Sequence, residues 1–429
     1  MFAKESLFYS LTKYLNSENF LIILLFTLIS IRTTVDYIGM YVSISLPGIG
    51  QASLSRIFGL IVIPITIFFI YKKFKEILKI PAIEMLLLII LLDIITIPIT
   101  PHIDIKLAII EVLRLLGIVF IYAISYISIK SIENFRKLNY VILLSSFVSI
   151  VFTLFQLIFG IGYTDVAFSE LRIMGAFTHP NVYGVYLLSV LSSILILIVL
   201  SKSKKESLFL YIALSIQFLA LTLTFTRIAW LMGLFIILSF VFIRNKILVI
   251  PIILIVIMSY IMIPQIHSRL HEAITLSPDS SLVWRYNLWH DTIFYTISNK
   301  DTIFGNGTAS FMNFAESIRG NLFGDLEPHN EFVKAFVENG IIGLVIFIMY
   351  NITFTFSLIT SMHKTKDKKM KNIFYILSTL FIALIIASIT DHILSSTPLE
   401  WVVMALIGGA FSIKAHEQLS SSKQQTKQK

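Results

Sequence analysis

Long runs of apolar residues alternate with short polar segments along almost the whole chain. A run of roughly 17–25 apolar residues is long enough to cross a bilayer as a helix. The pattern therefore predicts an all-α polytopic membrane protein with about twelve transmembrane helices. The expected spans lie near residues 20–40, 56–72, 83–100, 107–129, 138–159, 181–200, 208–226, 229–243, 247–264, 331–360, 373–392 and 399–413.

Lysine and arginine residues cluster in every second connection between these runs. If the N-terminus lies in the cytoplasm, 23 of the 34 basic residues fall on the cytoplasmic side, as the positive-inside rule requires. This predicts cytoplasmic N- and C-termini and places the two longest connections, 160–180 and 265–330, outside. The net charge of +9 then reflects membrane topology, and nucleic acid is not an expected partner.

Three segments outside the spans have patterns of their own. Residues 1–19 carry apolar residues on one side and lysines on the other, which predicts a cytoplasmic amphipathic arm. In the extracytoplasmic loop 265–330, between the ninth and tenth spans, apolar residues at spacings of three and four predict a surface helix near 281–298. Residues 301–311 are expected to turn and lead into a flexible stretch. Residues 414–429 are polar, with many Ser, Gln and Lys residues, and predict a disordered cytoplasmic tail.

Composition excludes several classes of protein. Of the 429 residues, 56% are hydrophobic and only 14% are charged, which is incompatible with a soluble domain of this size. The chain has no cysteine, so disulfides, thiol catalysis and cysteine-ligated metals are excluded.

Three arginines on the predicted outer side could bind an anion. Arg227 is the only charged residue between Ser207 and Ile243, and a charge at such a place is costly unless it is paired or hydrated. Alone, Arg227 could be a snorkelling arginine, Arg285 a ligand of lipid headgroups, and Arg172 an ordinary loop cation. Together they could suit a diphosphate, because guanidinium groups bind phosphate oxygens through paired hydrogen bonds.

His329 is the candidate general base. It lies in the segment Glu327-Pro328-His329-Asn330-Glu331, which ends the long outer loop and opens the next span. Pro328 and Glu331 predict the start of a helix here. His329 could simply cap that helix. Nearby arginines and a helix N-terminus would keep its imidazole neutral, so that it could take a proton from a hydroxyl group.

Charged residues inside the spans leave a different class open. Asp93, Glu111 and Arg114 lie within expected membrane helices, where such residues often mark a path for protons or ions. They support the alternative of a carrier-lipid oligosaccharide flippase or a proton-coupled permease. Glu111 and Arg114, three residues apart, could equally neutralise each other. No internal repeat is visible, which counts against a transporter built from two related halves.

Four groups of motifs occur in a characteristic order. They are RIMGAFTHPNVYG at 172–184, TRIAW at 226–230, SLVWR at 281–285 with IFGNG at 303–307, and PHNE at 328–331 with ENGIIGL at 338–344. These motifs resemble those of the O-antigen ligase and polymerase superfamily of bacterial inner-membrane glycosyltransferases. The resemblance implies a glycosyltransferase-C-like fold, with its active site on the periplasmic or outer face of the inner membrane.

The resemblance also implies a reaction. A glycan would pass from undecaprenyl diphosphate to an acceptor hydroxyl, with inversion and without a metal or other cofactor. By motif position, Arg227 and Arg285 would hold the diphosphate and His329 would activate the acceptor. The donor or acceptor cavity would be shaped by Arg172, His179, Asn181, Asn330 and Glu331.

The acceptor distinguishes the members of this superfamily. A polymerase extends a carrier-linked glycan, a ligase transfers the chain to lipid A core, and a third group glycosylates pilin-like proteins. We favour a polymerase because of the form Arg-x-x-Gly-x-Phe-x-His-Pro-Asn, with a ligase as the alternative. The expected partners are the lipid bilayer, the undecaprenyl-diphosphate-linked glycan, a glycan or lipid A core acceptor, and other polysaccharide assembly proteins.

Overall fold

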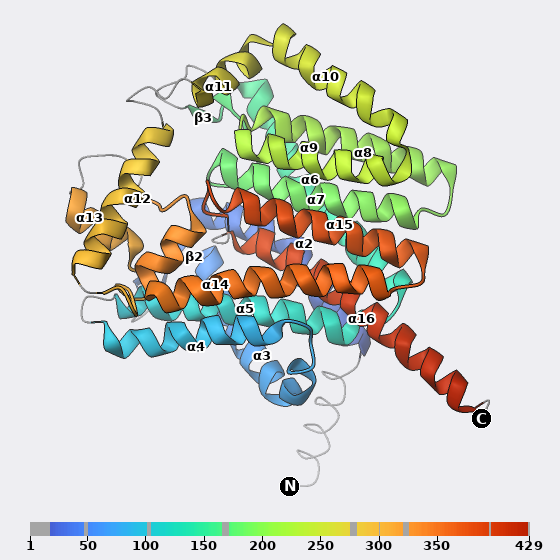
Figure 1. The fold of residues 1–429 in the computed structure, drawn as a ribbon, viewed down its shortest axis with the longest axis horizontal. Helices are drawn as coiled ribbons and strands as arrows, with labels where there is room; N and C mark the ends of the chain where they lie inside the picture. Colours follow the sequence, from blue (N-terminus) through green and yellow to red (C-terminus); the bar gives the residue numbers. More distant parts are fainter. Residues whose placement is uncertain are drawn as a thin grey trace.

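The computed structural model describes residues 18–46, 50–100, 104–164, 171–274, 281–299, 301–320, 326–393 and 396–427. The predicted arm at 1–19 therefore falls almost wholly outside the described residues. Most of the described chain forms helices that run side by side in one bundle (Figure 1). Among these residues, ten helices are long and apolar enough to cross a membrane. The prediction of an all-α polytopic membrane protein is confirmed.

The ten helices coincide with ten of the twelve expected spans. They are α2 (Glu18–Tyr41), α3 (Leu54–Ile77), α5 (Ile105–Ser128), α6 (Ile132–Phe159), α7 (Pro180–Leu200), α8 (Lys204–Leu223), α9 (Arg227–Arg244), α14 (Glu331–Lys364), α15 (Lys368–Ala387) and α16 (Thr397–Lys427). The other two segments form the shorter helices α4 (Ile83–Ile99) and, after the 3-10 turn η1 (Lys246–Leu248), α10 (Val249–Met262). With 1.5 Å per residue, α10 is about 21 Å long, less than the hydrocarbon core of a bilayer. Twelve spans therefore stay a prediction.

Side-chain caps define where several helices begin. The Ser131 side chain accepts the Asn134 N–H at the start of α6, Ser203 accepts the Glu206 N–H at the start of α8, and Asp367 accepts the Met370 N–H at the start of α15. These caps satisfy backbone N–H groups that have no partner within the helix. Each of these cap residues lies three residues after the end of the preceding helix. The connections α5–α6, α7–α8 and α14–α15 are therefore short.

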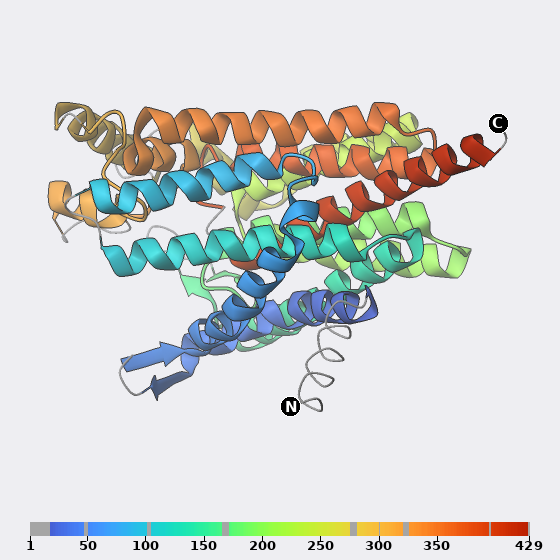
Figure 2. The same ribbon diagram turned by 90° about the horizontal axis from the view of Figure 1, so that it is seen from below.

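The helices α7 and α16 form the buried centre of the bundle. α7 packs against α6, α8, α9 and α15, and α16 lies along α5. Both are apolar around most of their circumference, as a helix covered on every side must be. α10 has no buried residue and lies at the edge of the bundle (Figure 1). From below, α14 and α4 form one side of the molecule and α2 the opposite side (Figure 2).

The longer connections gather at the end of the bundle away from the C-terminal end of α16 (Figure 1). They include two antiparallel hairpins and three short helices. The hairpins pair β1 (Ser43–Leu46) with β2 (Gly50–Ser53) and β3 (Tyr163–Thr164) with β4 (Leu171–Arg172); the helices are α11 (Pro264–Ile274), α12 (Ser281–Ser298) and α13 (Phe311–Arg319). α12 has the limits predicted for the surface helix. The chain turns after residue 301 as expected, but α13 takes the place of the predicted flexible stretch.

A kink divides α14 near its N-terminal end. Gly340 has a φ of 64°, which breaks the helical hydrogen-bond ladder. The carbonyl groups of Val337 and Glu338 instead accept the backbone N–H groups of Asn306 and Gly307, at 2.9 and 2.7 Å. The turn that contains Gly305 is thus joined to α14 through its backbone, and two motifs far apart in the sequence form one structural unit.

The C-terminal segment differs from its prediction. Residues 414–429 were expected to be a disordered tail, but α16 continues as a helix to Lys427. Neither glycine nor proline follows Gly409. Alanine, glutamate, glutamine and lysine in this segment have good helix propensity, so nothing in the sequence ends the helix at the expected point.

The role of the close contact between the Gly305 turn and α14 can be tested by adding a side chain at Gly305. A Cβ at Gly305 would lie 2.4 Å from the Glu338 carbonyl oxygen, and the φ of Gly305 is positive. We expect Gly305→Ala to destabilise the protein by about 1–3 kcal/mol, measured as a lower melting temperature in detergent. Gly59→Ala is the control, because a Cβ there meets nothing within 4 Å. Equal melting temperatures of the two variants would contradict this role.

Candidate active site

His329 lies at the corner where the outer loop meets α14. Its φ of 44° is in the left-handed region, which is uncommon for residues other than glycine, although histidine adopts it more often than most. Asn330 is the N-cap of α14, and its side chain accepts the N–H groups of Phe332 and Val333 at 2.9 and 3.1 Å. The helix therefore starts at Glu331, and Pro328 does not form its first turn as expected.

A carboxylate orients the His329 side chain. The Nδ1 atom of His329 lies 3.1 Å from Oδ1 of Asp391, which follows the end of α15. His329 is 7% exposed and Asp391 is 5% exposed. A carboxylate can only accept a hydrogen bond, so Nδ1 must carry the proton, and in the neutral imidazole Nε2 is then the basic nitrogen.

The electrostatic environment of Asp391 keeps it ionised. Burial on its own would raise the pKa of Asp391, but the hydrogen bond from His329 and the positive charge of Arg285 lower this pKa to about 2. Sequence reasoning considered only the positive groups around His329, which favour a neutral imidazole. The Asp391 carboxylate acts in the opposite direction, because it stabilises the imidazolium that forms when His329 takes up a proton.

Two residues of α12 hold the backbone on both sides of this pair. Trp289 Nε1 donates a hydrogen bond to the carbonyl oxygen of Pro328 at 2.6 Å, and Arg285 Nη1 donates one to the carbonyl oxygen of Thr390 at 2.6 Å. Pro328 precedes His329 and Thr390 precedes Asp391. Because Arg285 and Trp289 are four residues apart on a helix, they lie on the same face. α12 thus links the two segments that carry the imidazole and the carboxylate.

Arg172 ties two other segments together. Its Nη2 donates to Oδ1 of Asn181 at 2.7 Å and lies 3.3 Å from Oγ1 of Thr226, while Nε donates to the carbonyl oxygen of Thr224 at 3.0 Å. Thr226 is the residue before Arg227, which begins α9. The buried Arg172 therefore fixes the start of α9 and with it the position of the Arg227 backbone.

His179 and Glu331 have well-defined structural contacts. His179 is the N-cap of α7, and its Nδ1 accepts the Asn181 N–H at 3.1 Å. Glu331 donates its backbone N–H to the Ser388 carbonyl oxygen at 2.9 Å, and its Oε1 lies 2.9 Å from Nδ1 of His392. Glu331 thereby holds the segment that contains Asp391 against the start of α14.

A cavity of about 540 Å³ adjoins the His329–Asp391 pair. His179, Asn181, His329 and Asp391 line it, together with residues of α2, α3 and α16. Five of the expected site residues are not among those that line it: Arg172, Arg227, Arg285, Asn330 and Glu331. Within the described part of the chain, no three His, Cys, Asp or Glu side chains are placed to share a metal ion.

The charged residues within the spans form a separate cluster. Glu111 pairs with Arg114 at 2.8 Å, and Arg114 also pairs with Glu400. Lys334 lies 3.5 Å from Glu111 and 3.9 Å from Glu338. These residues, with Glu331 and Asp93, line a second cavity of about 100 Å³.

Two hydrogen bonds meet at Oδ1 of Asp93. It accepts hydrogen bonds from Thr308 at 2.9 Å and from Asn339 at 3.0 Å. Both partners belong to the joint between the Gly305 turn and α14, so this lone intramembrane acid takes part in the packing of that joint.

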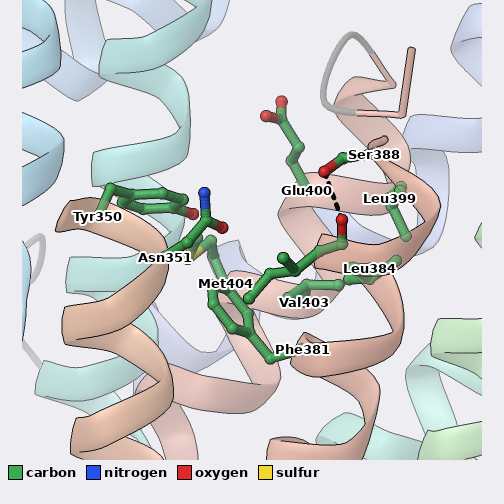
Figure 3. A pocket seen from close by; sticks show the side chains of 10 residues that line it. Tyr350, Asn351, Phe381, Leu384, Ser388, Leu399, Glu400, Val403 and Met404 are labelled. Carbon is green, nitrogen blue, oxygen red and sulfur yellow. Dashed lines mark hydrogen bonds between the residues drawn. The ribbon is translucent and has the colours of Figure 1, made fainter. Parts of the chain in front are cut away.

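A third pocket, between α14, α15 and α16, is too small for a substrate. Its volume is about 30 Å³, which is room for one or two water molecules. Figure 3 shows Tyr350 and Asn351 of α14 facing Phe381 and Leu384 of α15 across this pocket. The 540 Å³ cavity is the candidate substrate site because His329 and Asp391 line it.

Sequence reasoning missed Asp391, His392 and Glu400. Asp391 and His392 end the eleventh expected span, where an ionisable pair at the outer end of a membrane helix is a signal of function. Glu400 opens the twelfth span and could have been matched with Arg114. Their partners are 61 to 286 residues away in the sequence, so only the folded chain identifies them.

The fold and site describe a multi-pass membrane protein with a buried imidazole–carboxylate pair beside a large polar cavity. Residues 210–348, about a third of the chain, match a family model described as O-antigen ligase. This match confirms the resemblance to the O-antigen ligase and polymerase superfamily. The matched segment contains Arg227, Arg285 and His329, whereas Arg172, His179, Asn181 and Asp391 lie outside it. No curated protein matches the chain.

The depressed pKa of Asp391 makes a prediction about stability. A carboxyl group with a lowered folded-state pKa stabilises the fold above its ordinary pKa of 3.8, and this contribution is lost as the pH falls through about 2. We expect wild type to melt at a higher temperature than Asp391→Asn at pH 7, with the difference shrinking below about pH 4. In His329→Ala this pH-dependent contribution should be smaller and its loss should be complete at a higher pH, because the folded-state pKa of Asp391 rises when the contact that lowers it is gone. A difference independent of pH would contradict the ionised pair.

Proposed function

We propose that this protein is a metal-independent inverting glycosyltransferase that uses an undecaprenyl-diphosphate-linked glycan as donor. The acceptor is a hydroxyl group at the outer face of the bacterial inner membrane, and the product is a polymerised surface polysaccharide. The observation that carries this proposal is the contact between His329 and Asp391 at the edge of the 540 Å³ cavity. The superfamily match supports the reaction type.

The proposed chemistry is a single displacement. Nε2 of His329 takes the proton of the acceptor hydroxyl while that oxygen attacks the anomeric carbon of the donor sugar. The bond between this carbon and the diphosphate oxygen breaks, and undecaprenyl diphosphate leaves with the bonding electrons. Attack opposite the leaving group inverts the anomeric configuration. Asp391 keeps the imidazole in the reactive tautomer and stabilises the imidazolium, as an acidic partner does in other base-activated hydroxyl reactions.

In this proposal, arginines neutralise the leaving diphosphate. Arg227 begins α9, so the backbone N–H groups of its first turn add a positive field. Arg285 lies beside Thr390, close enough to Asp391 to affect its pKa. Because neither arginine is among the residues that line the 540 Å³ cavity, the diphosphate would lie at its margin, with the glycan inside.

The contacts within the spans speak against a transporter. Asp93 is hydrogen-bonded to Thr308 and Asn339, and Arg114 is paired with Glu111 and Glu400. A proton or ion path would need these groups to exchange partners with a moving ion. Their contacts with one another instead join α4, α5, α14 and α16, which is a structural role.

Activity of single variants tests the assigned roles. In proteoliposomes that contain the lipid-linked donor and acceptor, we expect His329→Ala to reduce product formation by about 10²–10⁴-fold, because the general base is lost. Arg227→Ala should reduce it by about 10²–10³-fold, because the departing charge is no longer neutralised. The readout is release of undecaprenyl diphosphate.

His290→Ala is the matched control for these variants. His290 is an exposed histidine of α12 that contacts its neighbour Asp291, and its loss should leave activity within about twofold of wild type, as for other surface substitutions. Normal turnover by well-folded His329→Ala protein would refute the proposed base.

The glycan profile of a deletion strain tests the class of acceptor. For a polymerase, we expect surface lipid capped with single repeat units, which wild type but not His329→Ala restores to long chains on a gel. Uncapped lipid with accumulating carrier-linked chains would instead identify a ligase. Unchanged surface glycans would contradict both.

A further inference from the structure

One part of the large cavity has no role in the reaction as described so far. Asp36 and Gly39 of α2, with Ser53 of β2 and Ser55 of α3, line the same 540 Å³ cavity as His329 and Asp391. We call these four residues the α2–α3 wall. None of them belongs to the matched segment 210–348 or to the motifs of the sequence analysis.

Asp36 is held in a fixed orientation. Arg32, one turn earlier on α2, donates Nε to Asp36 Oδ2 at 3.1 Å and places Nη2 2.8 Å from Oδ1. The Arg32 guanidinium itself lies 5.0 Å from the ring centre of Trp401 and 5.6 Å from that of Phe58. Aromatic rings on a guanidinium restrict its motion, so the carboxylate of Asp36 is preorganised.

The Arg32 fork leaves acceptor capacity on Asp36. A carboxylate offers about four lone-pair positions on its two oxygens, and one paired arginine uses about one on each. The Ser55 side chain also hydrogen-bonds Asp36, which leaves about one position for an O–H donor from a ligand. Asp36 and the neighbouring serine hydroxyls are together suited to bind hydroxyl groups of a sugar.

Hydroxyl groups supply the rest of this surface. Ser53 and Ser55 adjoin Asp36 along the wall, and Ser396 and Thr397 line the cavity from the segment that opens α16. Ser396 is 7% exposed, and its Oγ has no hydrogen-bond partner within the described residues. Such an unpaired buried hydroxyl is costly, and a hydroxyl of a ligand would satisfy it.

The chemistry of the lining also selects among sugars. Among the described residues that line the cavity there is neither lysine nor arginine, whereas Asp36, Glu327 and Asp391 are acids. A phosphate or carboxylate on a sugar offers only hydrogen-bond acceptors, which these acids cannot serve. The lining therefore favours uncharged sugars with free hydroxyl groups.

We infer that the α2–α3 wall, centred on Asp36, is a binding subsite for an uncharged, hydroxyl-bearing sugar of the acceptor glycan. This inference rests on the proposed function, because the acceptor must approach His329 within the same cavity. The diphosphate of the donor binds elsewhere, at the arginines outside the lining.

Ligand binding tests the subsite without requiring turnover. The probe is the oligosaccharide released by mild acid from the strain's own lipid-linked repeat unit, titrated against purified protein in nanodiscs, with melting temperature as the readout. We expect Asp36→Asn to raise the dissociation constant of this oligosaccharide about tenfold, the loss of about one charge-assisted hydrogen bond. Binding of inorganic pyrophosphate should be unchanged in Asp36→Asn and weakened in Arg227→Ala.

Glu18→Gln is the matched control, because Glu18 is a carboxylate of the same helix whose ion pair with Lys130 lies far from the cavity. If Asp36→Asn does not fold, Ser53→Ala replaces it, with an expected two- to threefold weakening from the loss of one neutral hydrogen bond. Oligosaccharide affinity equal to wild type in the folded variant, or no binding to wild type, would overturn the subsite. Wild-type protein that binds the oligosaccharide but releases no undecaprenyl diphosphate from the lipid-linked donor would refute the proposed function and leave the subsite standing.

Discussion

The hydrogen bond between His329 and Asp391 is the contact on which the organisation of this site depends. It joins the start of α14 to the end of α15, two points separated by 62 residues. Both groups are buried, so an unpaired Asp391 carboxylate would be costly. The surrounding contacts hold both members of this pair. Trp289 and Arg285 bind the preceding carbonyl groups, and Glu331 binds the segment that contains Asp391 through Ser388 and His392.

The large cavity is lined by acids but by neither lysine nor arginine among the described residues. The lining of the large cavity carries acids, histidines and hydroxyl groups, while Arg172, Arg227 and Arg285 lie outside that lining. Such a separation fits a reaction in which a neutral glycan and an anionic leaving group occupy adjacent places. Arg172 shows that an outer arginine can also serve the fold, since its hydrogen bonds join the α7 and α9 N-termini.

The kink of α14 connects the site to the membrane interior. At Gly340 the helix gives up its own hydrogen bonds, and the Gly305 turn replaces them. The same turn brings Thr308 to Asp93, and the straight part of α14 below the site brings Lys334 to Glu111. The helix that follows the candidate base is therefore fixed by three sets of contacts: those with the Gly305 turn, the contact between Thr308 and Asp93, and the contact between Lys334 and Glu111. These contacts limit how far His329 can move.

Local sequence determined which segments are helices and which connections lie at the same end of the bundle. Apolar runs and charged connections report these directly, because both reflect how each segment partitions between lipid and water. The spacing of apolar residues also gave the limits of α12, and the motifs named Arg227, Arg285 and His329. The helical tail was missed although its residues have good helix propensity, and the helix α13 was also missed.

Only the tertiary structure decided which side chains meet. Asp391 became the partner of His329, Glu400 the partner of Arg114, and Asp36 part of the same cavity, because the bundle brings together segments that are distant in the chain. In the sequence, each of these three residues is only an isolated acid within or next to an apolar run. The pattern of apolar and polar residues in one segment depends on whether that segment lies in lipid or water. A pair of interacting side chains or a cavity forms only when several helices pack together.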